Sequence, residues 1–172
     1  MKFVLGIIVA GFMFTAAPAR AQDADKVTKA EAAALAWLAL TDAGDYPRSW
    51  DQAAGYFQAS ISKPNWIHAV GNVRQPLGRL ISRKVRSAKY TRSLPGAPDG
   101  EYVVIQYDTQ FENKDGAIET ITGLLEKGGS WKVSGYFIKW PTMLVLRVAF
   151  VGAPAILFAW SAMAITAPPS RS

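Results

Sequence analysis

The stretch 101-EYVVIQYDTQFE-112 decides the fold. Apolar and polar side chains alternate along it, and successive side chains of a β-strand point to opposite faces of a sheet. The alternation therefore predicts a strand with one buried face and one exposed face. The buried face should hold Val103, Ile105, Tyr107, Thr109 and Phe111, and the exposed face Gln106, Asp108 and Gln110.

Turn sequences bound this strand on both sides. The segment 94-LPGAPDG-100 precedes it and 113-NKDG-116 follows it, and both are rich in the residues that turns require. Further strand patterns lie at residues 80–94, 117–126 and 130–138. Four consecutive strands joined by short turns predict an antiparallel meander.

Three helices should precede the sheet. Residues 27–44 carry an apolar stripe at helical spacing, with Thr28 as the expected N-cap and Gly44 as the stop. Proline-initiated helices should follow at residues 47–60 and 64–75. This order predicts an α+β domain in which three helices pack on one face of a curved four-stranded sheet.

The N-terminus has the three parts of a secretory signal. Lys2 is positive, an apolar run follows, and Ala19-Arg20-Ala21 is a small-x-small cleavage site. We therefore expect residues 1–21 to be removed and residues 22–139 to form one exported domain.

The C-terminus carries a second apolar segment. Residues 143–167 contain a single charge, Arg147, and residues 148–164 contain none. This length is at the lower end for spanning a bilayer. We expect a transmembrane helix that anchors a periplasmic domain in the inner membrane. An interfacial helix, or an apolar tail packed on the domain, stays open as an alternative.

Composition excludes several kinds of chemistry. The chain has no cysteine, which excludes disulfides, thiolate metal sites and thiol nucleophiles. His68 is the single histidine, so a histidine-rich metal site cannot form, and neither a Gly-x-Ser-x-Gly elbow nor a glycine-rich phosphate loop is present. We expect neither a metal nor a cofactor.

The basic residues are concentrated in one part of the chain. No acidic residue lies between positions 66 and 98. The basic residues there are Arg74, Arg79, Arg83, Lys84, Arg86, Lys89 and Arg92. Because the domain is expected to be exported, we expect no nucleic-acid partner. An anionic envelope component fits this charge better, and the alternative is a solvated edge strand whose charges discourage pairing.

Several blocks of sequence resemble a bacterial family of domains of unknown function, numbered 4019. They include 36-AWLALTDAGDY-46, 74-RQPLG-78, 94-LPGAPDGEY-102 and 131-WKVSGY-136, and the resemblance covers about residues 29–139. It implies a secreted α+β domain and no particular activity. The order of elements is similar to cone-like or cystatin-like folds, which host both enzymes and binding domains.

The expected function is binding without catalysis. We predict a ligand- or partner-binding domain whose site lies on the concave side of the sheet. Its residues should be Tyr90, Arg92, Tyr107 and Tyr136, with Arg83 and Arg86 at the rim. One alternative is a small-molecule enzyme of cone-like fold that uses Asp108 or His68 as a base. Another is a structural partner of a membrane protein.

Overall fold

The structure is a computed structural model that describes residues 17–140. Helices come first and strands second, as expected. The helices are α1 (Ala17–Asp42), α2 (Tyr46–Gln52), α3 (Gly55–Ser60) and α4 (Lys63–Leu77). The strands are β1 (Leu80–Thr91), β2 (Tyr102–Phe111), β3 (Lys114–Leu125) and β4 (Trp131–Lys139).

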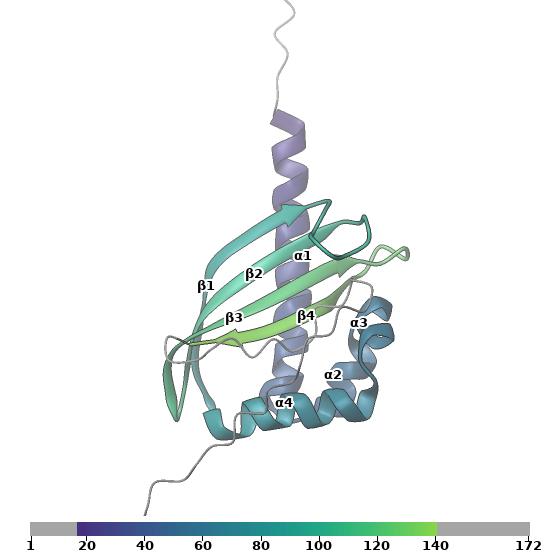
Figure 1. Ribbon diagram of the computed structural model, residues 1–172. Coiled ribbons are helices and arrows are strands. Elements are labelled where there is room, and N and C mark those ends of the chain that lie inside the picture. The colour runs from purple at the N-terminus through teal and green to yellow at the C-terminus, as the bar shows by residue number, and fades with distance from the viewer. Residues whose placement is uncertain (1–16, 141–172) are drawn as a thin grey trace, which may run out of the picture.

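The four strands form one antiparallel sheet in the order β1-β2-β3-β4. The helix α1 crosses one face of this sheet, and α4 lies at one end of it (Figure 1). The alternation expected in β2 is confirmed, because its odd-numbered residues from Val103 to Phe111 are all buried. Asp108 points to the opposite face, and its side chain is 56% exposed.

The predicted helix at residues 47–60 is wrong in one respect, because the chain forms two short helices there. Ala53 and Ala54 between them have extended backbones, with ψ of 166° and 149°. The Ala54 amide donates to the carbonyl of Val133 in β4 at 2.8 Å. Residues 17–140 therefore contain four helices where three were expected, and the break fastens the helical layer to the edge of the sheet.

The first helix begins earlier than its sequence pattern indicated. It starts at Ala17, so Thr28 is an interior residue whose hydroxyl donates to the Ala24 carbonyl at 3.0 Å, and not an N-cap. Residues 21–25 are exposed, and this end of α1 projects beyond the sheet (Figure 1). The stop is confirmed, since Gly44 follows the helix with a φ of 74° that favours glycine.

Aromatic side chains fill the space between the helices and the sheet. Trp66 of α4 is fully buried and packs edge-on against Phe57 of α3 at 5.0 Å between ring centroids. Trp37 of α1 contacts both Trp66 and Tyr136 of β4. Its indole donates to the Ser49 carbonyl at 2.7 Å, so this buried polar atom is satisfied. The domain's own side chains thus occupy the helix-facing side of the sheet.

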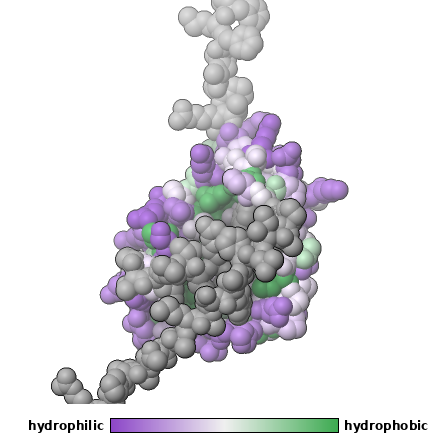
Figure 2. Space-filling view, viewed as in Figure 1, coloured by the Kyte–Doolittle hydropathy of each residue, from purple (hydrophilic) through white to green (hydrophobic). Residues whose placement is uncertain are grey.

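Residues 1–16 and the expected anchor at 143–167 lie outside the described residues. Within residues 17–140, no helix is both long and apolar enough to cross a membrane. Figure 2 shows the side of the molecule seen in Figure 1, where the coloured surface is mostly hydrophilic with a few small hydrophobic areas.

Candidate functional site

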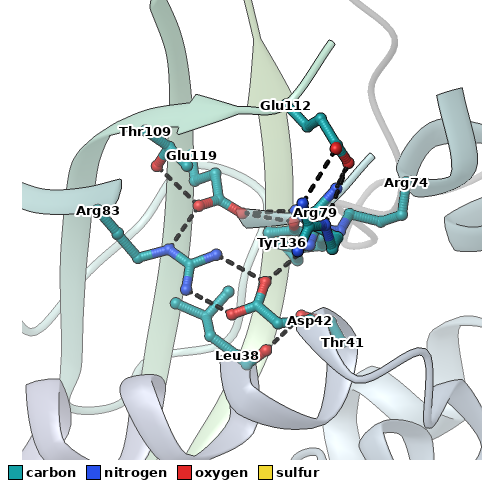
Figure 3. A network of polar contacts seen from close by, with 10 residues as sticks. All are labelled: Leu38, Thr41, Asp42, Arg74, Arg79, Arg83, Thr109, Glu112, Glu119 and Tyr136. Atoms are coloured by element: carbon teal, nitrogen blue, oxygen red, sulfur yellow. Dashed lines mark hydrogen bonds and ion pairs between the residues drawn. The ribbon is translucent and has the colours of Figure 1, made fainter. Parts of the chain in front are cut away.

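A buried network of charged side chains lies where the C-terminal end of α1 meets the sheet and α4 (Figure 3). Its two acids are Asp42, the last residue of α1, and Glu119 of β3, which has no exposed surface. Its two bases are Arg74 of α4 and Arg83 of β1. The formal charges of these four residues cancel, and such cancellation is what burial of charge requires.

Glu119 accepts hydrogen bonds through both of its carboxylate oxygens. Arg83 Nε donates to Oε2 at 2.6 Å, and the Thr109 hydroxyl donates to the same atom at 2.7 Å. The Tyr136 hydroxyl donates to Oε1 at 2.6 Å, and Arg74 Nη1 lies 3.6 Å from that oxygen. Short charge-assisted bonds of this kind fix the orientation of a carboxylate.

Asp42 completes the network from the helix side. The Arg83 guanidinium binds it as a fork, with 2.7 Å from Nη1 to Oδ2 and 3.0 Å from Nη2 to Oδ1. Arg74 Nη2 adds a third bond at 2.7 Å. Burial alone would lower the pKa of Arg83, but its hydrogen bonds to Asp42 and Glu119 outweigh this and raise it above the usual range.

Two tyrosines beside this network are buried and weakly acidic. Burial, followed by the negative charge of Glu119, raises the pKa of Tyr136 well above the ordinary value. Burial also raises the pKa of Tyr107 to about 12. The Tyr107 hydroxyl has no hydrogen-bond partner among the described residues, and neither do Nε and Nη1 of Arg74. The Arg74 guanidinium lies 4.4 Å from the centre of the Phe111 ring, so one face of the guanidinium packs on this ring.

A shallow depression of about 280 Å³ connects this network to the surface. Asp42, Arg74 and Tyr46 line it, and Arg79 and Glu112 stand at its rim, 3.1 Å apart. Both helices that end here direct the negative ends of their dipoles toward it, and the arginines offset that charge. Each acid that lines the depression is already paired with an arginine.

The six predicted site residues lie in three places. Tyr136 and Arg83 meet at Glu119, and Tyr107 is the cross-strand neighbour of Glu119. Arg86 lies on the other side of β1, where its Nε is 3.2 Å from Asp108. The remaining two residues lie at the C-terminal end of β1, where Tyr90 is in the strand and Arg92 follows it directly.

The cluster around Tyr90 joins the first half of α1 to the sheet. The Tyr90 hydroxyl donates to Glu101 at 2.9 Å and accepts from Arg92 Nε at 3.1 Å. Lys26 of α1 forms an ion pair with Glu101 and lies over the Tyr90 ring. The hydrogen bond from Lys26 is the main cause that lowers the pKa of Glu101. The cluster is accessible to solvent, and it ties the first half of α1 to the sheet.

The two residues considered as bases stand apart from the network. Asp108 is exposed and paired with Arg86. His68 is exposed on α4, where its Nδ1 lies 3.3 Å from the side-chain nitrogen Nδ2 of Asn72. Within residues 17–140 no group of His, Asp and Glu side chains is arranged to hold a metal ion.

The sequence suggested Glu119 only as a possible partner of Asp108 across the hairpin, and it did not predict the buried network or the part of Asp42 in it. A signal for Glu119 was present, since it lies between Ala117 and Ile121 on the buried side of β3. Asp42 likewise continues the inward stripe of α1, one turn after Leu38. An acid in an otherwise apolar register predicts a buried cation opposite it.

A comparison with protein families identifies residues 33–136 as a match to the family described as "Protein of unknown function (DUF4019)". That span holds every residue of the buried network. No match was found among curated proteins or among solved structures.

Proposed function

The chain belongs to the DUF4019 family, whose function is unknown. We propose that it is a non-catalytic binding domain of the cell envelope. In this proposal the domain is exported, is tethered to the inner membrane through residues 143–167, and binds a partner protein.

The observation that carries the proposal is the state of the buried carboxylates. General acid–base catalysis needs a group that can exchange a proton with a substrate within hydrogen-bond reach. Glu119 instead accepts from Arg83, Thr109 and Tyr136, and has no exposed surface. Asp42 is held by two arginines. This arrangement favours a structural role for the network and leaves recognition to the surface.

The exposed apolar side chains favour a protein partner over a small ligand. In residues 17–140 the large hydrophobic side chains exposed to solvent are Leu35, Ile81 and Val85, which are 44%, 55% and 46% exposed. Leu35 lies on α1, and the other two lie on the edge strand β1. Two of these three side chains thus lie on a single edge strand, which supports contact with another protein chain.

Fractionation of cells that express the full chain with a C-terminal tag tests export and tethering. We expect the tag to resist carbonate extraction and to be released by detergent. Protease added to spheroplasts should remove the domain and leave the tag intact. Recovery of the intact chain in the soluble periplasmic fraction would contradict the tether.

Sedimentation of the detergent-extracted chain tests binding. We expect a complex heavier than a single chain, after correction for bound detergent. A single species with the mass of one chain, extracted under mild conditions, would contradict the proposed binding function.

A further inference from the structure

We propose that the free edge of β1 binds an extended segment of the partner protein in which acidic and apolar residues alternate. This inference rests on the proposed binding function and specifies its surface and the chemistry of its partner.

Among residues 17–140, the outer edge of β1 has unused hydrogen-bonding groups. The strand is twelve residues long and stands at one end of the sheet order. Within the part of the chain that the structure describes, no backbone group pairs with this edge. An edge of this length is a template for a further strand, whose main chain supplies affinity and whose side chains supply specificity.

The side chains on the outer face of β1 favour acidic residues in the partner strand. Lys84 and Lys89 lie opposite Asp108 and Val104 on the face of the sheet away from the helices. Both lysines are exposed, and neither forms an ion pair within residues 17–140. A strand added beside β1 would place its own outer-face side chains next to these lysines, where carboxylates are favoured.

The helix-facing side of β1 favours apolar residues in the partner strand. Val85 lies opposite the buried Tyr107 and is itself 46% exposed. Leu35 lies two turns before Asp42 on the same face of α1, and Asp42 binds Arg83 of β1. Leu35 therefore faces the β1 edge. The inner side chains of an added strand would cover Val85 and Leu35, which gives the acidic–apolar alternation.

The same features disfavour a second copy of this chain as the occupant. Pairing of β1 with β1 would bring the lysines of both strands together, and like charges across strands are destabilising. This repulsion acts against a basic strand and leaves an acidic one acceptable.

The test uses the full chain in mild detergent and a fluorescent heptapeptide of alternating Glu and Val as the probe. A peptide of alternating Lys and Val is the matched control. Fluorescence anisotropy should show saturable binding of the acidic peptide only. Amide hydrogen exchange should show new protection in β1, confined to residues 80–91. Equal binding of both peptides, no binding, or protection elsewhere would overturn the inference.

Charge-reversal variants complete the test. Lys84→Glu with Lys89→Glu should weaken binding of the acidic peptide by about tenfold or more, from the size of exposed charge pairs, and should create binding of the Lys-Val peptide. Lys127→Glu with Lys139→Glu makes the same change of net charge away from β1 and should leave binding unchanged. Equal effects of the two pairs would show a non-specific charge effect and would overturn the inference.

The two proposals fail in different ways. A sedimentation experiment that finds no complex with a partner contradicts the binding function itself. A complex that survives Lys84→Glu with Lys89→Glu, together with unaltered binding of the acidic peptide, contradicts the β1 edge alone and leaves the binding function in place.

Discussion

Arg83 donates from Nε to Glu119 at 2.6 Å and from its terminal nitrogens to Asp42, so one guanidinium joins the sheet to α1. Its side chain is only 7% exposed. The interaction connects positions that are far apart in the chain, and it fixes the angle at which α1 crosses the strands.

Loss of the Arg83 guanidinium should destabilise the domain strongly. In Arg83→Met, the buried Glu119 and the partly buried Asp42 lose their main cation, and we expect a loss of about 3–5 kcal/mol in the free energy of unfolding. Urea denaturation measures the change. Arg86→Met is the control, since its pair with Asp108 is solvent-exposed and should contribute less than about 1 kcal/mol. Comparable losses in the two variants would contradict a structural role for the network.

The two buried tyrosines near Glu119 should respond differently to loss of the hydroxyl. Tyr136→Phe removes a donor from a buried carboxylate and should cost about 1–3 kcal/mol. Tyr107→Phe removes a hydroxyl that has no partner among the described residues, so stability should be unchanged or slightly higher. Thermal and urea unfolding of both variants measure this. A large loss in Tyr107→Phe would mean that its hydroxyl has a partner.

Stability should fall at alkaline pH. Burial raises the pKa of Tyr107 to about 12 from an ordinary 10.0, and it raises the pKa of Tyr136 as well. A group with a raised folded-state pKa contributes stability that is complete below its unfolded-state pKa and is lost as the pH rises through the folded-state value. The free energy of unfolding should therefore decline between about pH 10 and 12.

Tyr107→Phe provides the control for this pH dependence. The variant lacks one of the titrating phenols, so its decline above about pH 10 should be shallower than that of the wild type. Identical slopes would show that Tyr107 titrates normally and that its environment is more polar than described.

Removal of residues 1–21 should leave the domain's stability unchanged. Residues 21–25 are exposed, and Lys26 is the point at which α1 is tied to Glu101 and Tyr90. A chain that begins at Gln22 keeps this tie, whereas a chain that begins at Thr28 loses it together with the partly buried Val27. Parallel denaturation of the two chains should show a lower midpoint only for the shorter one. A lower midpoint for the chain that begins at Gln22 would mean that the preceding residues pack on the domain.

The meander could be predicted in detail because its signals are local. The alternation in β2 specified both faces, so Val103 and Asp108 were assigned to the correct sides. The block 94–100 marked the turn before β2, whereas the turn expected at 113–116 is shorter, because β3 already begins at Lys114. The break at Ala53 and Ala54 could not be predicted, because alanine favours helix and the break depends on a bond to Val133 of β4. Tertiary contacts override local propensity at that point.

The candidate site could be predicted only in part. Tyr136 and Arg83 were selected from their strand positions, and the structure brings both to Glu119. The sequence analysis grouped them with Tyr90 and Arg92, but the structure places these two residues in a different cluster, at the other end of β1. Pairing between Asp42 and Arg83 depends on the angle of α1 across the sheet, which no local sequence pattern records.

The most direct test of partner binding is photocrosslinking in intact cells from a benzoylphenylalanine placed at Val85. Val85 is exposed on the β1 edge, and His68, exposed on α4, provides the control position. The account predicts a crosslinked species from Val85 that is absent from His68, with the crosslink located in an acidic and apolar segment of the partner. No crosslink from Val85, or the same crosslinks from both positions, would contradict it.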